Sequence, residues 1–102
     1  MHHPPVPLSV PYMDHLDIPS PNSQGFLELI HKCQTRVHVF VGHYHVDKTV
    51  QVDNLMVWAC PSTYYQMSQT AEKFEIGDYR PGYRLIEIHP ERLLVRSHYV
   101  TD

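Results

Sequence analysis

The fold prediction depends most on one run of residues, Val37-His38-Val39-Phe40-Val41-Gly42-His43-Tyr44-His45. Apart from His38, its first five residues are apolar and β-branched or aromatic, a composition typical of a short buried strand. Gly42 ends that strand. In open α/β sheets, ligand sites border the carboxyl ends of the strands. The segment 42–45 is therefore expected to lie at the edge of the sheet where a ligand would bind.

A helix is predicted upstream of this strand, at about residues 23–34. Its apolar side chains recur at the spacing i, i+3, i+4 and i+7, which forms one stripe along a helix. They are Phe26, Leu29, Ile30 and Cys33. A helix followed by a short buried strand indicates one step of a parallel sheet. The preceding residues, 4–21, are rich in proline and predict an extended loop with neither helix nor sheet pairing.

Two antiparallel hairpins are predicted after the strand. The first spans residues 49–59 and turns at Asp53-Asn54, a favourable two-residue turn. The second spans residues 83–100 and turns at 89–92. The polar segment between them, 64–80, is predicted to be irregular.

Length and composition limit the chain to one domain. It has 102 residues, which is at most one ordinary domain, and it is 42% hydrophobic and 19% charged, as globular proteins are. The predicted class is α/β, or α+β for the chain in isolation. It comprises one helix, one buried strand and two antiparallel hairpins, in a single partial domain over residues 1–102.

Several partners are not expected. The net charge of −3 leaves no basic surplus for a nucleic-acid polymer. No apolar run approaches the roughly 18 residues that span a bilayer, so no membrane association is expected. No signal peptide is visible. Cys33 and Cys60 stand in apolar settings and are predicted to be buried, reduced thiols of a cytoplasmic protein.

Histidines are the candidate functional residues, because the chain has nine of them. In extended backbone His43 and His45 would point to one side and Tyr44 to the other. Gly42 would allow another segment to approach closely. Imidazole suits first-row transition metals, although many His-x-His pairs are ordinary surface or core residues. A second candidate is the His2-His3 pair, which a remnant of a purification tag or a polar terminus would also explain.

Together these motifs resemble the calcineurin-like metallophosphoesterases, and within them the branch of class III cyclic-nucleotide phosphodiesterases and glycerophosphodiesterases. The resemblance runs nearly end to end. Five motifs carry it in order: His2-His3-Pro4-Pro5-Val6-Pro7, Met13-Asp14, Gly42-His43-Tyr44-His45, Pro61-Ser62-Thr63 and Pro81-Gly82-Tyr83-Arg84. The resemblance implies the C-terminal part of a four-layer α/β/β/α domain. It also implies a metal-dependent hydrolase acting on small phosphodiesters such as 3′,5′-cyclic nucleotides.

The resemblance also implies a ligand set. His2 and His43 would bind one metal ion and His45 the other, with manganese, iron or zinc as the candidate metals. His3 would be an outer-shell or substrate-facing group, although the sequence leaves open which of His2 and His3 is the ligand. Other histidines are interpreted as surface or hydrogen-bonded residues: His31, His38, His89 and His98. His15 is a weaker candidate for lining a substrate pocket.

The chain departs from the family in one large respect. The family's Asp-x-His, Gly-Asp and Gly-Asn-His motifs, which supply the bridging carboxylate, have no counterpart here. The chain is therefore expected to be a part of the enzyme, to hold one metal ion or none, and to have little or no activity alone. The strand at 37–41 would lack sheet neighbours, so self-association is expected. Two alternatives stay open: a non-catalytic binding or oligomerisation module, and a metal-binding protein unrelated to phosphoesters.

Overall fold

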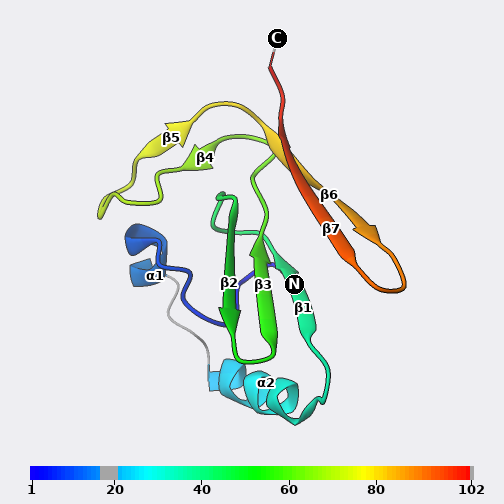
Figure 1. The fold of residues 1–102 in the computed structure, drawn as a ribbon. Coiled ribbons are helices and arrows are strands. Elements are labelled where there is room, and N and C mark those ends of the chain that lie inside the picture. The colour runs from blue at the N-terminus through cyan, green and yellow to red at the C-terminus, as the bar shows by residue number, and fades with distance from the viewer. Residues whose placement is uncertain (17–20, 102) are drawn as a thin grey trace.

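A computed structural model of the chain describes residues 1–16 and 21–101 and has the mixed helix and strand content of an α+β protein (Figure 1). In chain order its elements are α1 (Pro11–Leu16), α2 (Pro21–Lys32), β1 (Val37–Val41), β2 (Lys48–Val52), β3 (Leu55–Ala59), β4 (Gln66–Met67), β5 (Ile76–Asp78), β6 (Gly82–Ile88) and β7 (Leu93–Tyr99). No helix in the described ranges combines the length and the apolar character needed to cross a membrane.

The central sheet has the strand order β1-β3-β2. Strand β1 pairs in parallel with β3, and β2 pairs antiparallel with β3. The predicted strand and first hairpin are therefore confirmed, but the strand is not buried throughout. Only Val41 of β1 is buried, because β1 lies at an edge of the sheet. The hairpin turns at Asp53, whose φ of 52° is a left-handed conformation that Asp tolerates. The side-chain amide of Asn54 donates hydrogen bonds to three carbonyl oxygens at and beyond the end of α2. They belong to Ile30, Cys33 and Thr35.

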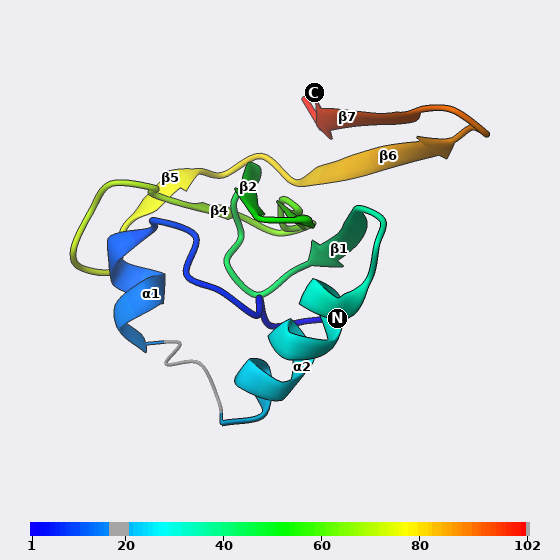
Figure 2. The same cartoon turned by 60° about the horizontal axis from the view of Figure 1, so that its bottom comes forward.

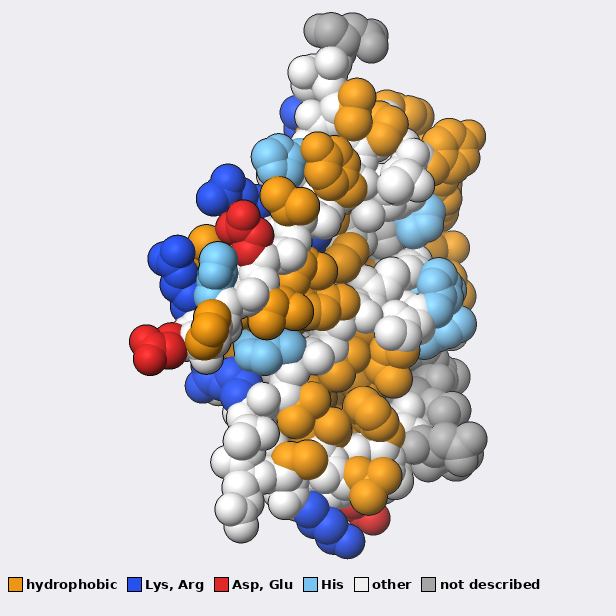
Figure 3. Space-filling view, turned by 90° about the vertical axis from the view of Figure 1, so that its right-hand side faces the viewer, with side chains coloured by type: hydrophobic (Ala, Val, Ile, Leu, Met, Phe, Trp, Pro, Cys, Tyr) orange, Lys and Arg blue, Asp and Glu red, His pale blue; other side chains and the backbone are white. Residues whose placement is uncertain are grey.

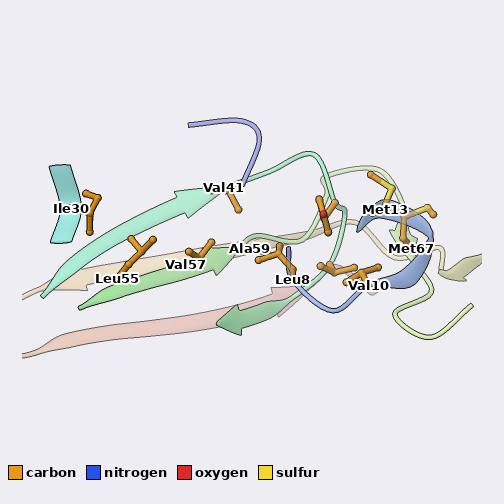
Figure 4. Packing of buried hydrophobic residues seen from close by; sticks show 11 residues of the cluster. Leu8, Val10, Met13, Ile30, Val41, Leu55, Val57, Ala59 and Met67 are labelled. Carbon is orange, nitrogen blue, oxygen red and sulfur yellow. The ribbon is translucent and has the colours of Figure 1, made fainter. Parts of the chain in front are cut away.

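The hydrophobic core lies between one face of this sheet and the N-terminal third of the chain. Strand β3 alternates between fully and partly buried residues, which is the period of two that a strand imposes. Its buried side chains, Leu55, Val57 and Ala59, pack with residues of α1, α2 and the N-terminal loop. Those partners include Leu8, Val10, Met13 and Ile30 (Figure 4). Figure 2 shows the two helices on one side of the sheet and the β6–β7 hairpin on the other.

Two expectations about the first third of the chain were wrong, and the predicted helix is confirmed with shifted bounds. The loop predicted at 4–21 contains α1, because a proline is compatible with the first position of a helix and Pro11 occupies it. The main helix begins and ends about two residues before the predicted 23–34. Its apolar stripe is only partly covered, since Leu29 and Cys33 are exposed, so Cys33 is not a buried thiol.

The second predicted hairpin is confirmed as β6–β7, which pairs from Gly82↔Tyr99 to Ile88↔Leu93. It is attached to the central sheet at its base. The Arg84 guanidinium, whose side chain is 5% exposed, forms an ion pair with Asp47 and lies over the Trp58 ring. The segment predicted to be irregular at 64–80 holds one short antiparallel pair, β4–β5.

Candidate metal centre

The N-terminal residues lie along the edge of β1 that no other strand pairs with. The Met1 ammonium donates a hydrogen bond to the Phe40 carbonyl at 3.2 Å, and the Gly42 amide donates to the His2 carbonyl at 3.0 Å. A Cβ atom at position 42 would lie 3.4 Å from Nδ1 of His2. The expectation that Gly42 allows close approach is therefore confirmed, and the approaching segment is the one that carries His2.

Three histidines gather at this edge. His2 Nε2 and His43 Nδ1 lie 3.2 Å apart, although 41 positions separate the two residues in sequence. The His3 ring lies 4.1 Å from the His43 ring and 4.8 Å from the His2 ring, measured between centroids. One ligand nitrogen from each of the three lies within 4.8 Å of the other two. We call His2, His3 and His43 the histidine cluster.

The backbone that presents His43 is not extended, and this overturns one step of the sequence argument. His43 and His45 both adopt left-handed conformations, with φ of 65° and 54°. Alternation of side chains along an extended strand therefore does not place them. Non-glycine residues held in such conformations cost about 1–3 kcal/mol each and gather at functional sites. The Tyr44 side chain is buried in the core at 1% exposure, and its ring meets the His43 ring edge to face at 6.2 Å between centroids.

A partly buried carboxylate, that of Asp14, holds this loop in place. The Tyr44 hydroxyl donates to Asp14 Oδ1 at 2.6 Å, and the amides of Leu8 and Val10 donate to the same carboxylate at 3.0 Å each. Asp14 therefore connects α1, the N-terminal loop and the residue between His43 and His45. On sequence alone, Asp14 falls in the loop predicted at 4–21 and has no assigned role. Its presence in the Met13-Asp14 motif was the one feature of the sequence that could have indicated this supporting role.

His45 lies outside the histidine cluster and has a different environment. Its Nδ1 is 3.0 Å from the Tyr65 carbonyl oxygen, and the two rings lie 4.8 Å apart. A carbonyl oxygen only accepts hydrogen bonds, so Nδ1 is the donor, and in a neutral imidazole the lone pair then lies on Nε2. This is the tautomer in which an imidazole can bind a metal through Nε2.

Most of the remaining histidines have contacts of their own with the protein. His38 Nδ1 accepts a hydrogen bond from the Trp58 indole at 3.0 Å, His98 stacks on Tyr83, and His31 lies 3.7 Å from an Asp53 oxygen. His15 is exposed at the end of α1, and His89 is exposed in the turn of the β6–β7 hairpin.

Comparison with known proteins relates the chain to phosphodiesterases. No family model matches it. It is 33% identical over 87 residues to a probable cyclic nucleotide phosphodiesterase of Fibrobacter succinogenes. It is 29% identical over 91 residues to a 3′,5′-cyclic-nucleotide phosphodiesterase of Nostoc. It is also 29% identical over 90 residues to a 3′,5′-cyclic adenosine monophosphate phosphodiesterase of Pseudomonas aeruginosa.

These relationships confirm the resemblance inferred from the motifs. The matches cover 85%, 89% and 88% of the chain, but the chain spans only about a third of the length of each relative. The chain is thus similar to about a third of each of three proteins named as cyclic-nucleotide phosphodiesterases. More particularly, the chain is related to the cyclic-nucleotide phosphodiesterases and is consistent with a C-terminal part of such a protein.

Proposed function

We propose that this chain contributes the histidine ligands of a dinuclear-metal centre that hydrolyses phosphodiesters, with 3′,5′-cyclic nucleotides as the substrate class. One observation carries the proposal: His2 Nε2 and His43 Nδ1 lie 3.2 Å apart at the edge of β1. The activity for which the three related proteins are named supports the substrate class.

The donor set fits a transition metal. Ligand nitrogens bound to a tetrahedral ion at about 2.0–2.1 Å are about 3.4 Å apart, close to the His2–His43 separation. Neutral imidazole suits zinc and iron, whereas manganese favours oxygen ligands. Among the described residues the histidine cluster contains no carboxylate, so it fits one ion better than two. We propose His45 as a ligand of the second ion, through Nε2.

The chemistry divides between the ions and the chain. Two bound metal ions would supply Lewis-acid polarisation of the phosphate ester and a lowered pKa for a water nucleophile. His2 and His43 would fix the position of a bound ion and would act as neutral imidazole ligands. The Tyr65 carbonyl would keep His45 in the tautomer that presents Nε2, and Asp14, through Tyr44, would keep the loop of His43 and His45 in its strained conformation.

The isolated chain is expected to bind metal without efficient turnover. A bridging carboxylate would offset the repulsion between two dications, and the histidine cluster has none. The test is hydrolysis of bis-p-nitrophenyl phosphate by the pure chain with Mn²⁺, against a His43→Ala control. Robust turnover that His43→Ala abolishes would show that the chain needs no further ligands.

A chimera tests the proposed function itself. This chain would replace the matching third of the Fibrobacter succinogenes relative, and hydrolysis of 3′,5′-cyclic AMP would be measured. Turnover is expected, and His43→Ala or His45→Ala should remove it while leaving the circular dichroism spectrum unchanged. A folded chimera that binds metal yet hydrolyses no phosphodiester would refute the proposal.

An exposed apolar groove supports a second proposal, self-association of the chain. The groove has a volume of about 690 Å³ and lies between the sheet and the tip of the β6–β7 hairpin. Phe40, Met56 and Trp58 line it from the sheet, and Ile88 and Leu93 line it from the hairpin. Its other lining residues are polar or charged: Arg36, His38, His89, Glu91 and Arg92. Figure 3 shows hydrophobic side chains gathered on this side of the molecule. The groove contains no member of the histidine cluster.

We propose that a second copy of the chain covers this groove. A two-stranded hairpin is marginally stable in water by itself, and Ile88 at the end of β6 is 81% exposed. Sedimentation at increasing concentration should show a dimer that Ile88→Glu weakens. The matched control is Leu29→Glu on α2, where the side chain is 65% exposed and lies outside the groove. A monomer at every concentration would refute self-association.

A further inference from the structure

We infer that His3 completes, with His2 and His43, a three-imidazole site for a single transition-metal ion. This inference rests on the proposed metal-binding role of His2 and His43. It differs from the ligand set expected from the family resemblance, which includes His45 and takes only one of His2 and His3 as a ligand. The three side chains come from two segments, the N-terminus and the loop after β1, which the hydrogen bond from Gly42 to His2 holds together.

The position of the His3 ring supports this inference. Its centroid is 4.1 Å from that of His43, closer than the 5.0 Å that separates the centroids of His2 and His43. Adjacent residues of an extended strand point to opposite sides, yet the rings of His2 and His3 meet edge to face at 4.8 Å. Both rings therefore point toward His43.

Small movements would bring the three nitrogens onto one ion. Their mutual separations are at most 4.8 Å, and about 3.4 Å is required around a tetrahedral ion with ligands at about 2.0–2.1 Å. The His2 and His3 side chains are exposed, so their torsions can adjust, whereas Pro4 and Pro5 behind them are buried and hold the backbone. The required change is side-chain rotation and leaves the fold unaltered.

The donor set defines the class of ion. Three neutral imidazoles bind borderline ions such as Zn²⁺ and Co²⁺, and they are poor ligands for Mg²⁺ and Ca²⁺, which prefer oxygen. Because the rings of His2 and His3 are exposed, solvent can reach the fourth coordination position. Three protein ligands and one open position are the arrangement of catalytic zinc sites.

The test is Zn²⁺ titration of the full chain, followed by calorimetry and by NMR of the histidine ring nitrogens. We expect one Zn²⁺ per chain and changed ring-nitrogen shifts for His2, His3 and His43, with those of His15 unchanged. His3→Ala should weaken Zn²⁺ binding by more than about 100-fold, beyond the 10–100-fold typical of outer-shell residues. His15→Ala, another exposed histidine, is the matched control and should bind as the unaltered chain does.

The other outcomes separate this inference from the proposed function. If Zn²⁺ changes the ring nitrogens of His2 and His43 but not of His3, the inference is wrong and the proposed function stands. If His45 responds in place of His3, the ligand set expected from the resemblance is correct and the inference is wrong. If no histidine responds and no Zn²⁺ binds, the inference is wrong, and the proposed function is then decided by the chimera, where the remaining ligands are present.

Discussion

Tyr44→Phe is the substitution that tests how the candidate site is held. It deletes one hydroxyl from a side chain that is 1% exposed, and it removes the 2.6 Å hydrogen bond to Asp14 Oδ1. Hydrogen bonds to charged groups contribute about 1.5–3 kcal/mol. The amides of Leu8 and Val10 still donate to Asp14 in the variant, so the carboxylate is not left bare. We therefore expect the substitution to lower the free energy of unfolding by about 1.5–3 kcal/mol.

Urea unfolding measures this loss, and the single tryptophan, Trp58 on β3, provides the fluorescence signal. The midpoint should fall while the slope with urea stays constant, because the unfolded surface is unchanged. In an Asp14→Asn background the acceptor is neutral, so Tyr44→Phe should cost only about 0.5–1.5 kcal/mol. The matched control is Tyr79→Phe, since Tyr79 is 77% exposed. Equal losses for Tyr44→Phe in both backgrounds would refute the charged hydrogen bond as the cause.

Three further predictions concern the hairpin base and the cysteines. Gly82→Ala should lower the free energy of unfolding by about 1–3 kcal/mol in urea titrations, because the added Cβ would lie 2.9 Å from Pro61 Cβ and 3.0 Å from the Tyr99 ring. Iodoacetamide followed by peptide mass spectrometry should show Cys33 labelled before Cys60, because Cys33 is exposed and partial burial raises the pKa of the Cys60 thiol. Burial also raises the pKa of the Tyr99 phenol, assisted by the nearby Asp47 carboxylate. Both groups therefore contribute stability that is complete below about pH 8. This stability is lost as the pH rises past their unfolded pKa values, about 8.5 for Cys60 and about 10 for Tyr99. Urea midpoints that stay level up to about pH 11 would contradict this expectation.

Local patterns predicted the regular elements correctly where they are strong. The β-branched run at 37–41 and the turn at Asp53-Asn54 specified β1 and the first hairpin, because side-chain period and turn chemistry act within a few residues. The same reasoning missed α1, since proline at the first helical position resembles proline in a loop. It also failed to show that Leu29 and Cys33 would stay exposed, because exposure depends on which distant segments cover the helix.

For the candidate site, the sequence by itself determined the chemical types: several histidines, a glycine that permits close approach, and motifs of a known family. Only the tertiary structure decided which histidines meet. It placed His3 beside His43 and left His45 against Tyr65, and it showed that Asp14 supports the loop through Tyr44. The physical reason is that these contacts join residues some 20 to 41 positions apart, through left-handed backbone at His43 and His45 that no local periodicity encodes.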